Sequence, residues 1–399
     1  MAATTKGIFI VGAKRTPFGK MGGIFAKTSH TELSVIASTA AIQSANVKPE
    51  KIDSVIFGNV MSATSSDGIY LPRHVLLKCG IPLEKPAYAV NRLCGSGFQS
   101  VVNGIQSILT GESKIVLAGG AENMSQCPFA VRNIRYGTTI GQKYEFEDTL
   151  WAGLVDTYCQ LPMGLTAEKL GAKYSVTRDE ADQYSLRSQK LWKEAHDAGR
   201  FKAEIAPVPL KIKNKDVVVE VDEHPRQNAK IEDFSKLKSV FQKDGLVTAG
   251  TASGISDGAG AIILASEEAI KSEGLTPLAR IIGFSVVGVD PSIMGIGPVS
   301  AIRNLLKVTG KSIDDIELVE INEAFAAQTL SCIKDLKLDI NKVNVDGGAI
   351  ALGHPLAASG SRITAHLTHE LRRRKAGSLG IGSACIGGGQ GIAVLIESL

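Results

Sequence analysis

Lys48-Pro-Glu-Lys-Ile-Asp-Ser-Val-Ile-Phe-Gly-Asn59 and Lys311-Ser-Ile-Asp-Asp-Ile-Glu-Leu-Val-Glu-Ile-Asn322 share one pattern, in which a charged turn leads into an apolar strand that ends on asparagine. The two asparagines lie 263 residues apart. Each copy follows an amphipathic helix, and a fixed offset of this kind is the sign of an internal repeat. The pattern therefore predicts a duplicated unit.

The repeat extends outward from these strands. Each copy runs on into a small-residue turn and a helix, at Cys94-Gly-Ser-Gly97 and at His354-Pro-Leu-Ala-Ala-Ser-Gly360, 260 residues apart. An apolar strand with glycines follows in both, at 115–120 and at 379–383. Chance similarity of strand–helix patterns is the alternative, but four landmarks keep nearly one offset.

Strands that alternate with helices imply crossover connections and buried sheets covered by helices, which is an α/β fold. One unit is about 120 residues long, so roughly 130 residues lie inserted between the copies, near 122–249. The insert differs in character, with both tryptophans and a polar, charged stretch from Lys202 to Lys243.

Composition excludes several classes of protein. The chain has 399 residues, which predicts two or three domains, and 44% hydrophobic residues, which argues against disorder. A net charge of +4 is too weak for a dedicated nucleic-acid binder. The six cysteines form no CxxC pair and no zinc spacing, so we expect neither a disulfide scaffold nor a metal site. No apolar stretch reaches the ~20 residues of a transmembrane helix.

The N-terminus is poor in acidic residues. Lys6, Lys14, Arg15, Lys20 and Lys27 all precede the first acidic residue, Glu32. This composition is typical of an organellar targeting segment. Because residues 8–11 read as a strand, we expect such a signal to remain uncleaved.

Equivalent points of the two copies carry Cys94 and His354, each where a strand gives way to a helix. Helix N-termini present free N–H groups and a positive potential, which lower the pKa of a cysteine. A pseudo-twofold arrangement would bring both helix starts to one cleft and pair the cysteine with a base. Taken alone, each residue also has a purely structural interpretation: the cysteine could be a thiol packed in the core, and the histidine a hydrogen-bonded structural residue.

Two further positions carry possible chemistry. Cys385 precedes Ile386-Gly387-Gly388-Gly389, where glycine N–H groups could stabilise an oxyanion. Asn322 opens Asn322-Glu-Ala-Phe-Ala326 after a strand, where asparagine is most often a turn residue.

Together these segments resemble the thiolase family. The motifs are Asn91-Arg-Leu-Cys94-Gly-Ser-Gly, Asn322-Glu-Ala-Phe-Ala, Gly347-Gly-Ala-Ile-Ala-Leu-Gly-His354-Pro-Leu and Cys385-Ile-Gly-Gly-Gly-Gln-Gly. The resemblance covers essentially the whole chain and implies the thiolase fold, with two similar five-layered α/β/α/β/α halves and an inserted loop domain. It divides the chain into a first half at 1–121 plus 250–270, a CoA-binding loop domain at 122–249 and a second half at 271–399.

The resemblance also implies roles for the site residues. Cys94 would be the acylated nucleophile, His354 its base and Cys385 the acid/base at the acetyl α-carbon. Asn322, through a water, would join His354 in one oxyanion hole, and the N–H groups of Cys94 and Gly387 would form the other. Coenzyme A would be a co-substrate, with no tightly bound cofactor and no metal.

The same resemblance implies a CoA site. Arg226 would meet the adenosine phosphate end and Ser253 the pantetheine amides. Leu154, Met163, Phe241 and Phe325 would line the arm. Family members are dimers or tetramers, so we expect a homodimer or homotetramer. The other six histidines are expected to be structural or exposed.

Two departures bear on these expectations. Ala357 stands where the family usually has glycine; were that residue to need a positive φ, alanine would cost on the order of 1 kcal/mol. Pro162-Met163 stands where acetoacetyl-CoA thiolases carry His-Met. In having proline there, this chain resembles the mitochondrial 3-ketoacyl-CoA thiolases of fatty-acid β-oxidation. The expected compartment is therefore the mitochondrial matrix, with the cytoplasm as the alternative.

Several alternatives stay open at this stage. A biosynthetic acetoacetyl-CoA thiolase would use the same residues in reverse, condensing two acetyl-CoA. A ketoacyl-synthase type of condensing enzyme would pair its cysteine with two histidines, whereas here Asn322 and Cys385 occupy those places. A non-catalytic acyl-lipid carrier on this fold would have lost one of the four motifs.

Overall fold

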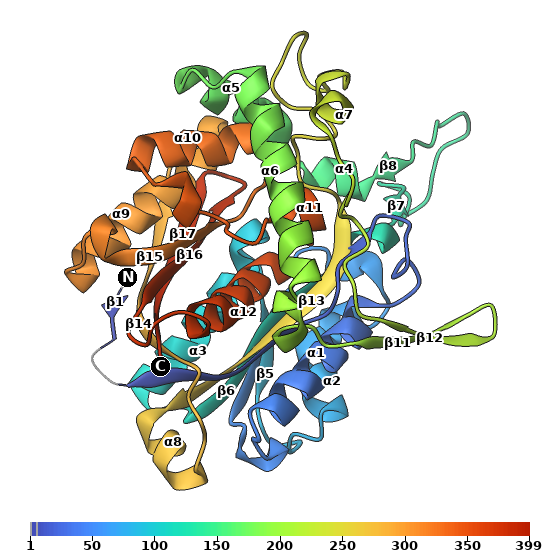
Figure 1. The fold of residues 1–399 in the computed structure, drawn as a ribbon. Coiled ribbons are helices and arrows are strands. Elements are labelled where there is room, and N and C mark those ends of the chain that lie inside the picture. Colours follow the sequence, from blue (N-terminus) through green and yellow to red (C-terminus); the bar gives the residue numbers. More distant parts are fainter. Residues whose placement is uncertain (1, 5–6) are drawn as a thin grey trace.

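The computed structural model describes residues 2–4 and 7–399, and one continuous sheet runs through it (Figure 1). Its strand order is β15-β16-β17-β14-β2-β13-β6-β4-β5, with the short strands β1 (Ala2–Ala3) and β3 (Gly19–Lys20) attached to β14 and β13. The two predicted halves meet where β14 pairs with β2 through only two residue pairs.

The first half contains β2 (Ile8–Arg15), β4 (Ser54–Gly58), β5 (Ala87–Val90), β6 (Ile115–Asn123) and β13 (Ser256–Ser266), with α1 (His30–Ser44), α2 (Leu71–Lys78), α3 (Ser96–Thr110) and α8 (Glu267–Glu273). The second contains β14 (Ala279–Gly288), β15 (Ile316–Ile321), β16 (Leu379–Ile386) and β17 (Gln390–Ser398), with α9 (Gly297–Thr309), α10 (Ala326–Leu336), α11 (Ala349–Leu352) and α12 (Ala358–Arg372). Equivalent strands pair in the same register in the two halves. Gly58 of β4 lies opposite Gly120 of β6, and Ile321 of β15 lies opposite Ser383 of β16, each 263 positions further along the chain.

The layers run helix, sheet, helix, sheet, helix. Helices α3 and α12 pack on each other between the two parts of the sheet, and their apolar faces form the largest core cluster. Helices α1 and α2 cover the outer face of the first half, and α9 and α10 that of the second. The five layers are therefore formed by the two halves together, because each half supplies one of the two central helices.

The strands are apolar on both faces because both faces are covered. In β6, Val116 and Ala118 face α3 and α12, while Ile115 and Leu117 face α1 and α2. Glycine is required where the central helices begin. A Cβ at Gly97 would lie 2.5 Å from the carbonyl oxygen of Ala357, and one at Gly120 only 1.9 Å from it.

The insert occupies the connection from β6 to β13, where the second half has only the turn between β16 and β17. It contains α4 (Thr149–Gly153), α5 (Met163–Lys173), α6 (Arg178–Asp197), α7 (Ile231–Ser235) and the hairpins β7 (Phe129–Ala130)/β8 (Glu147–Asp148), β9 (Val155–Asp156)/β10 (Leu161–Pro162) and β11 (Val208–Ile212)/β12 (Lys215–Val219). The hairpins β7/β8 and β11/β12 project from the body (Figure 1). No helix of the described residues is long and apolar enough to cross a membrane.

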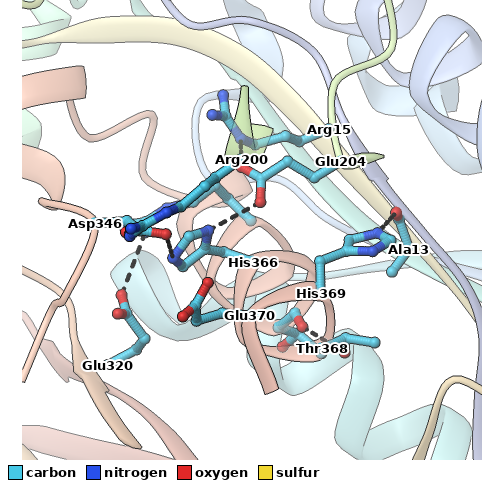
Figure 2. A network of polar contacts seen from close by, with 12 residues as sticks. Ala13, Arg15, Arg200, Glu204, Glu320, Asp346, His366, Thr368, His369 and Glu370 are labelled. Carbon is cyan, nitrogen blue, oxygen red and sulfur yellow. Dashed lines mark hydrogen bonds and ion pairs between the residues drawn. The ribbon is translucent and has the colours of Figure 1, made fainter. Parts of the chain in front are cut away.

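A buried network of charges ties the insert to both halves (Figure 2). Arg15 of β2 contacts Glu204 at 2.6 Å and Asp222 at 2.7 Å. The other oxygen of Glu204 lies 2.9 Å from Nδ1 of His366 on α12, and Nε2 of His366 lies 3.7 Å from Asp346. Arg15, which the sequence analysis grouped with targeting residues, is therefore a fully buried anchor in the folded protein. Lys6, another of those residues, lies outside the described part.

These contacts shift the pKa values of the network. Burial alone would lower the pKa of His366, but Glu204 raises it to about 9. Burial would raise the pKa of Glu204, but His366 and Arg15 hold it well below its usual range. His366 is thus an imidazolium at neutral pH.

We predict that this charge makes stability fall with rising pH. A raised histidine pKa contributes stability that is complete below about 6.5 and is lost as pH rises through about 9. The free energy of unfolding of the wild type, measured in urea, should fall relative to that of His366→Gln by about 3 kcal/mol between pH 6 and 10. His369→Gln on the same helix is the control, because burial lowers the pKa of His369, the opposite direction to the shift of His366. The prediction would be contradicted if the free energy of unfolding of the wild type fell by the same amount relative to His366→Gln and relative to His369→Gln.

Candidate active site

Cys94 lies in a single 3-10 turn, Leu93–Gly95, directly before α3. Leu93 adopts a φ of 46°, an uncommon conformation for a leucine that turns the chain sharply at the cysteine. The turn is held by Ser96, whose hydroxyl donates to the Leu93 carbonyl at 2.7 Å and accepts from the Arg92 N–H at 2.9 Å. The half-buried thiol is thereby presented at the edge of a cleft.

His354 comes from the matching place in the other half, between α11 and α12. Its backbone N–H donates to the Gly254 carbonyl at 2.9 Å, and its imidazole is 6% exposed. Nδ2 of Asn322 lies 3.3 Å from Nε2 of His354, so these two side chains are in direct contact at the cleft. Ala357 has a φ of −77°, so the alanine that replaces the usual glycine is not strained.

Cys385 and Gly387 approach from the end of β16. The backbone N–H of Gly387 lies close enough to the Cys94 thiol to work against the rise of its pKa. Cys385 is fully buried against Met294 and Ala324, with Met163 and Phe325 beside them. Gly388 and Gly389 adopt φ values of 76° and 80° in the turn that follows, which only glycine adopts readily.

The resting Cys94–His354 pair is neutral. Burial raises the pKa of Cys94 to about 11, although the N–H of Gly387 opposes this, and the charge of Glu122 raises it further. Burial lowers the pKa of His354 to about 3, and the charge of Arg362 adds to that effect. The expected lowering of the Cys94 pKa by the helix start is therefore wrong for the resting site, because the loss of solvent outweighs the helix potential. Burial also raises the pKa of Cys385.

A largely apolar cleft of about 830 Å³, including its open mouth, lies in front of Cys94 and His354. Seven of the predicted site residues line it: Cys94, His354, Ser253, Leu154, Met163, Phe241 and Phe325. Asn322, Cys385 and Gly387 lie behind its wall, next to the lining residues. Arg226 is exposed in a neighbouring hollow with Lys20 and His224, and Ile255 lines both spaces.

Other lining residues carried no signal in the sequence. Met124, Trp151, Met294 and Leu356 come from four separate segments, and only the fold shows that they meet. Trp151 stacks on Phe241 with ring centroids 6.5 Å apart. Of the described residues, no group of three or more His, Cys, Asp or Glu could hold a metal ion.

Glu122 is a buried residue that the sequence analysis did not single out. Its carboxylate accepts hydrogen bonds from Asn59 Nδ2 and from the N–H groups of Val60, Met61 and Ala357, at 2.8 to 3.2 Å. Burial raises its pKa to about 7, against the effect of these N–H groups. Glu122 therefore joins the turn after β4 in the first half to the start of α12 in the second.

A half-buried cysteine and a buried histidine, brought together from the matching ends of two α/β halves, define a site for covalent transfer through sulfur. The family model of the thiolase N-terminal domain matches residues 8–268, and that of the thiolase C-terminal domain matches residues 275–398. The chain belongs to the thiolase family.

Named relatives extend this finding. The mitochondrial 3-ketoacyl-CoA thiolase of Bos taurus is 58% identical over 99% of both chains. The crystal structure of human mitochondrial 3-ketoacyl-CoA thiolase matches with a TM-score of 0.97, 57% identity and 99% coverage of both chains. The structure of that human enzyme in complex with CoA matches with a TM-score of 0.96 and 56% identity, over 100% of this chain and 99% of that one.

We predict that Cys94 reacts slowly with iodoacetamide at neutral pH and faster in base. Because its pKa is raised to about 11, the thiolate fraction should grow about tenfold per pH unit between pH 7 and 9. The measurement is alkylation of the Cys94 peptide followed by mass spectrometry, which separates it from the five other cysteines. A rate that levels off below pH 8 would instead mean a lowered pKa.

Proposed function

We propose that this protein is a 3-ketoacyl-CoA thiolase that acts in fatty-acid β-oxidation. It cleaves a 3-ketoacyl-CoA with free CoA to give acetyl-CoA and a shortened acyl-CoA, through an acyl-Cys94 intermediate. The observation that carries the proposal is the meeting of Cys94 and His354 at one apolar cleft. The whole-chain identity to mitochondrial 3-ketoacyl-CoA thiolases supports the substrate class.

In the first half-reaction, Nε2 of His354 takes the proton of Cys94, and the sulfur attacks the 3-keto carbon. The N–H groups of Cys94 and Gly387 stabilise the oxyanion that forms. The bond between the α- and keto carbons then breaks and leaves the acyl group on Cys94. The enolate of acetyl-CoA departs, stabilised at its oxygen by His354 and, through a water, by Asn322, and takes a proton from the Cys385 thiol, which is left as a thiolate.

In the second half-reaction, the thiol of free CoA gives its proton to the Cys385 thiolate and its sulfur attacks the acyl-Cys94 carbonyl. The tetrahedral intermediate expels the Cys94 thiolate, which takes back the proton held on Nε2 of His354, and the shortened acyl-CoA leaves. A thiolate serves both steps because it is a good nucleophile and a good leaving group.

For CoA we propose the residues expected from the sequence. Arg226 binds the adenosine phosphate end, Ser253 the pantetheine amides, and Leu154, Met163, Phe241 and Phe325 the arm. The CoA complex of the human relative supports CoA as co-substrate, and we propose no tightly bound cofactor and no metal. We also keep the division into halves at 1–121 plus 250–270 and at 271–399, with a CoA-binding loop domain at 122–249.

We propose the mitochondrial matrix, with an uncleaved signal, as the compartment; the relatives named mitochondrial support it. We further propose a homodimer or homotetramer. The edge strand β5 and the exposed apolar side chains of Tyr136, Ile140 and Phe146 in the β7/β8 hairpin support association. Light scattering should give two or four times the chain mass of 42.1 kDa, and a monomer mass would reject association.

The direct test is thiolysis of 3-ketooctanoyl-CoA and acetoacetyl-CoA by the purified protein with free CoA. We expect the longer substrate to be cleaved with the higher kcat/KM. Cys94→Ala should lose at least about 10³-fold in kcat, because the nucleophile is gone. A strong preference for acetoacetyl-CoA would instead indicate an acetoacetyl-CoA thiolase, and full activity of Cys94→Ala would reject the nucleophile.

Cys385→Ala tests the second thiol. We expect it to lose exchange of the acetyl-CoA methyl protons with deuterium oxide, followed by NMR, because no acid/base remains at the α-carbon. Acylation of Cys94 by acyl-CoA should persist in this variant. Cys332→Ala is the matched control, since Cys332 is a fully buried thiol to which we assign no role. Exchange at the wild-type rate in Cys385→Ala would remove Cys385 as the base.

A further inference from the structure

The imidazole of His354 has a second contact, on the side away from Asn322. Its Nδ1 lies 2.5 Å from the hydroxyl oxygen of Ser359, in the first turn of α12. That oxygen also lies 3.1 Å from the carbonyl oxygen of Pro355. Ser359 is fully buried, so solvent does not compete for these bonds. The three residues belong to one tight loop, because His354, Pro355 and Ser359 lie within six positions of the chain.

The positions of the hydrogens follow from counting donors and acceptors. The hydroxyl of Ser359 donates to the carbonyl oxygen of Pro355, which also accepts from the backbone N–H groups of Ala358 and Ser359, so this bond uses the single hydroxyl hydrogen. The hydroxyl oxygen is then an acceptor toward His354, and Nδ1 carries the ring hydrogen. Nε2 is left with its lone pair, and it accepts from Nδ2 of Asn322 at 3.3 Å. In the three hydrogen bonds that link Asn322, His354, Ser359 and Pro355, each donor thus meets one acceptor.

The chemical nature of this partner matters. Among the described residues, no carboxylate makes a hydrogen bond or ion pair with His354, so its orienting partner is a neutral hydroxyl. A carboxylate at Nδ1 would both orient the ring and stabilise an imidazolium. A serine hydroxyl orients the ring and fixes the tautomer, but adds no charge. The ring stays neutral between turnovers while its lone pair is held on the side that faces the reacting groups.

We propose that Ser359 is a positioning residue that fixes the tautomer of His354, with Nδ1 protonated and Nε2 free to take the proton of Cys94. This inference rests on the roles proposed above for Cys94 and His354. It adds the group that leaves the correct nitrogen basic, a serine to which the sequence analysis assigned no role. Loss of the hydroxyl should leave a buried N–H without a partner and let the ring turn or change tautomer.

The matched pair of variants is Ser359→Ala and Ser361→Ala. Ser361 is also buried on α12, and its hydroxyl donates to the Ala358 carbonyl at 2.9 Å without contacting His354. We expect Ser359→Ala to lower the rate of Cys94 alkylation by iodoacetamide at pH 8 at least tenfold, with Ser361→Ala within about twofold of wild type. In thiolysis, kcat should fall by a similar factor while the KM values for CoA and the ketoacyl substrate stay within about twofold.

The alkylation assay contains no CoA and no ketoacyl substrate, so it reports on Ser359 even if the protein proves to act on another thioester. A wild-type alkylation rate in Ser359→Ala would overturn the proposal. So would an equal loss in Ser361→Ala, because the effect would then be a general loosening of α12.

A measurement on the wild-type protein needs no variant of Ser359. In ¹⁵N-histidine-labelled protein, the His354 signals are those missing from His354→Asn. Two-bond correlations to the ring carbon-bound hydrogens distinguish its nitrogens. We expect the Nδ1 shift of a protonated nitrogen and the Nε2 shift of an unprotonated one at pH 8. A proton found on Nε2 would overturn the proposal, whatever the variants show.

Discussion

The close crossing of α3 and α12 at their N-terminal ends is the contact on which the rest of the structure depends. The carbonyl of Ala357 lies where a side chain at Gly97 or Gly120 would be, and the backbone N–H of Phe98 lies 2.1 Å from where a Cβ of Gly360 would be. Because backbones touch there, the chain segments before the two helices, with Cys94 and His354, reach the same cleft. A methyl group at any of these glycines would push the halves apart and separate the thiol from its base.

Buried carboxylates hold the loops around this crossing in place. Glu122 accepts hydrogen bonds from backbone N–H groups of both halves, Val60 in the first and Ala357 in the second. Glu323, next to Asn322, accepts from Tyr184 and Ser188 of α6 and from the N–H of Ile350 ahead of His354. Each carboxylate would be costly to bury without these donors, and with them it fixes several backbone segments at once. The cleft is thus rigid on its polar side and apolar where an acyl chain would lie.

The internal repeat was enough to predict the paired helices, the insert and the meeting of Cys94 with His354, since matched positions in a duplicated fold lie together. Motif resemblance supplied Asn322, Cys385 and Gly387. The sequence could not show the raised pKa of Cys94, because burial of the site is a property of the packed halves. Arg15 read as a targeting residue because its partners, Glu204 and Asp222, are about 200 positions away. No role could be assigned to Ser359 or Met124, since serine at a helix start and methionine after a strand are common in every fold.

The two halves differ most in one connection. In the second half, Gly387, Gly388 and Gly389 join β16 to β17, and the N–H of the first lies near the thiol of Cys94. Residues added to that turn would move the N–H away, so its length is fixed by chemistry. The equivalent connection in the first half, from β6 to β13, carries no such group and spans residues 124–255. The symmetry of the two halves is therefore broken at this connection: one half keeps a three-residue turn beside Cys94, and the other carries the insert whose side chains wall the cleft.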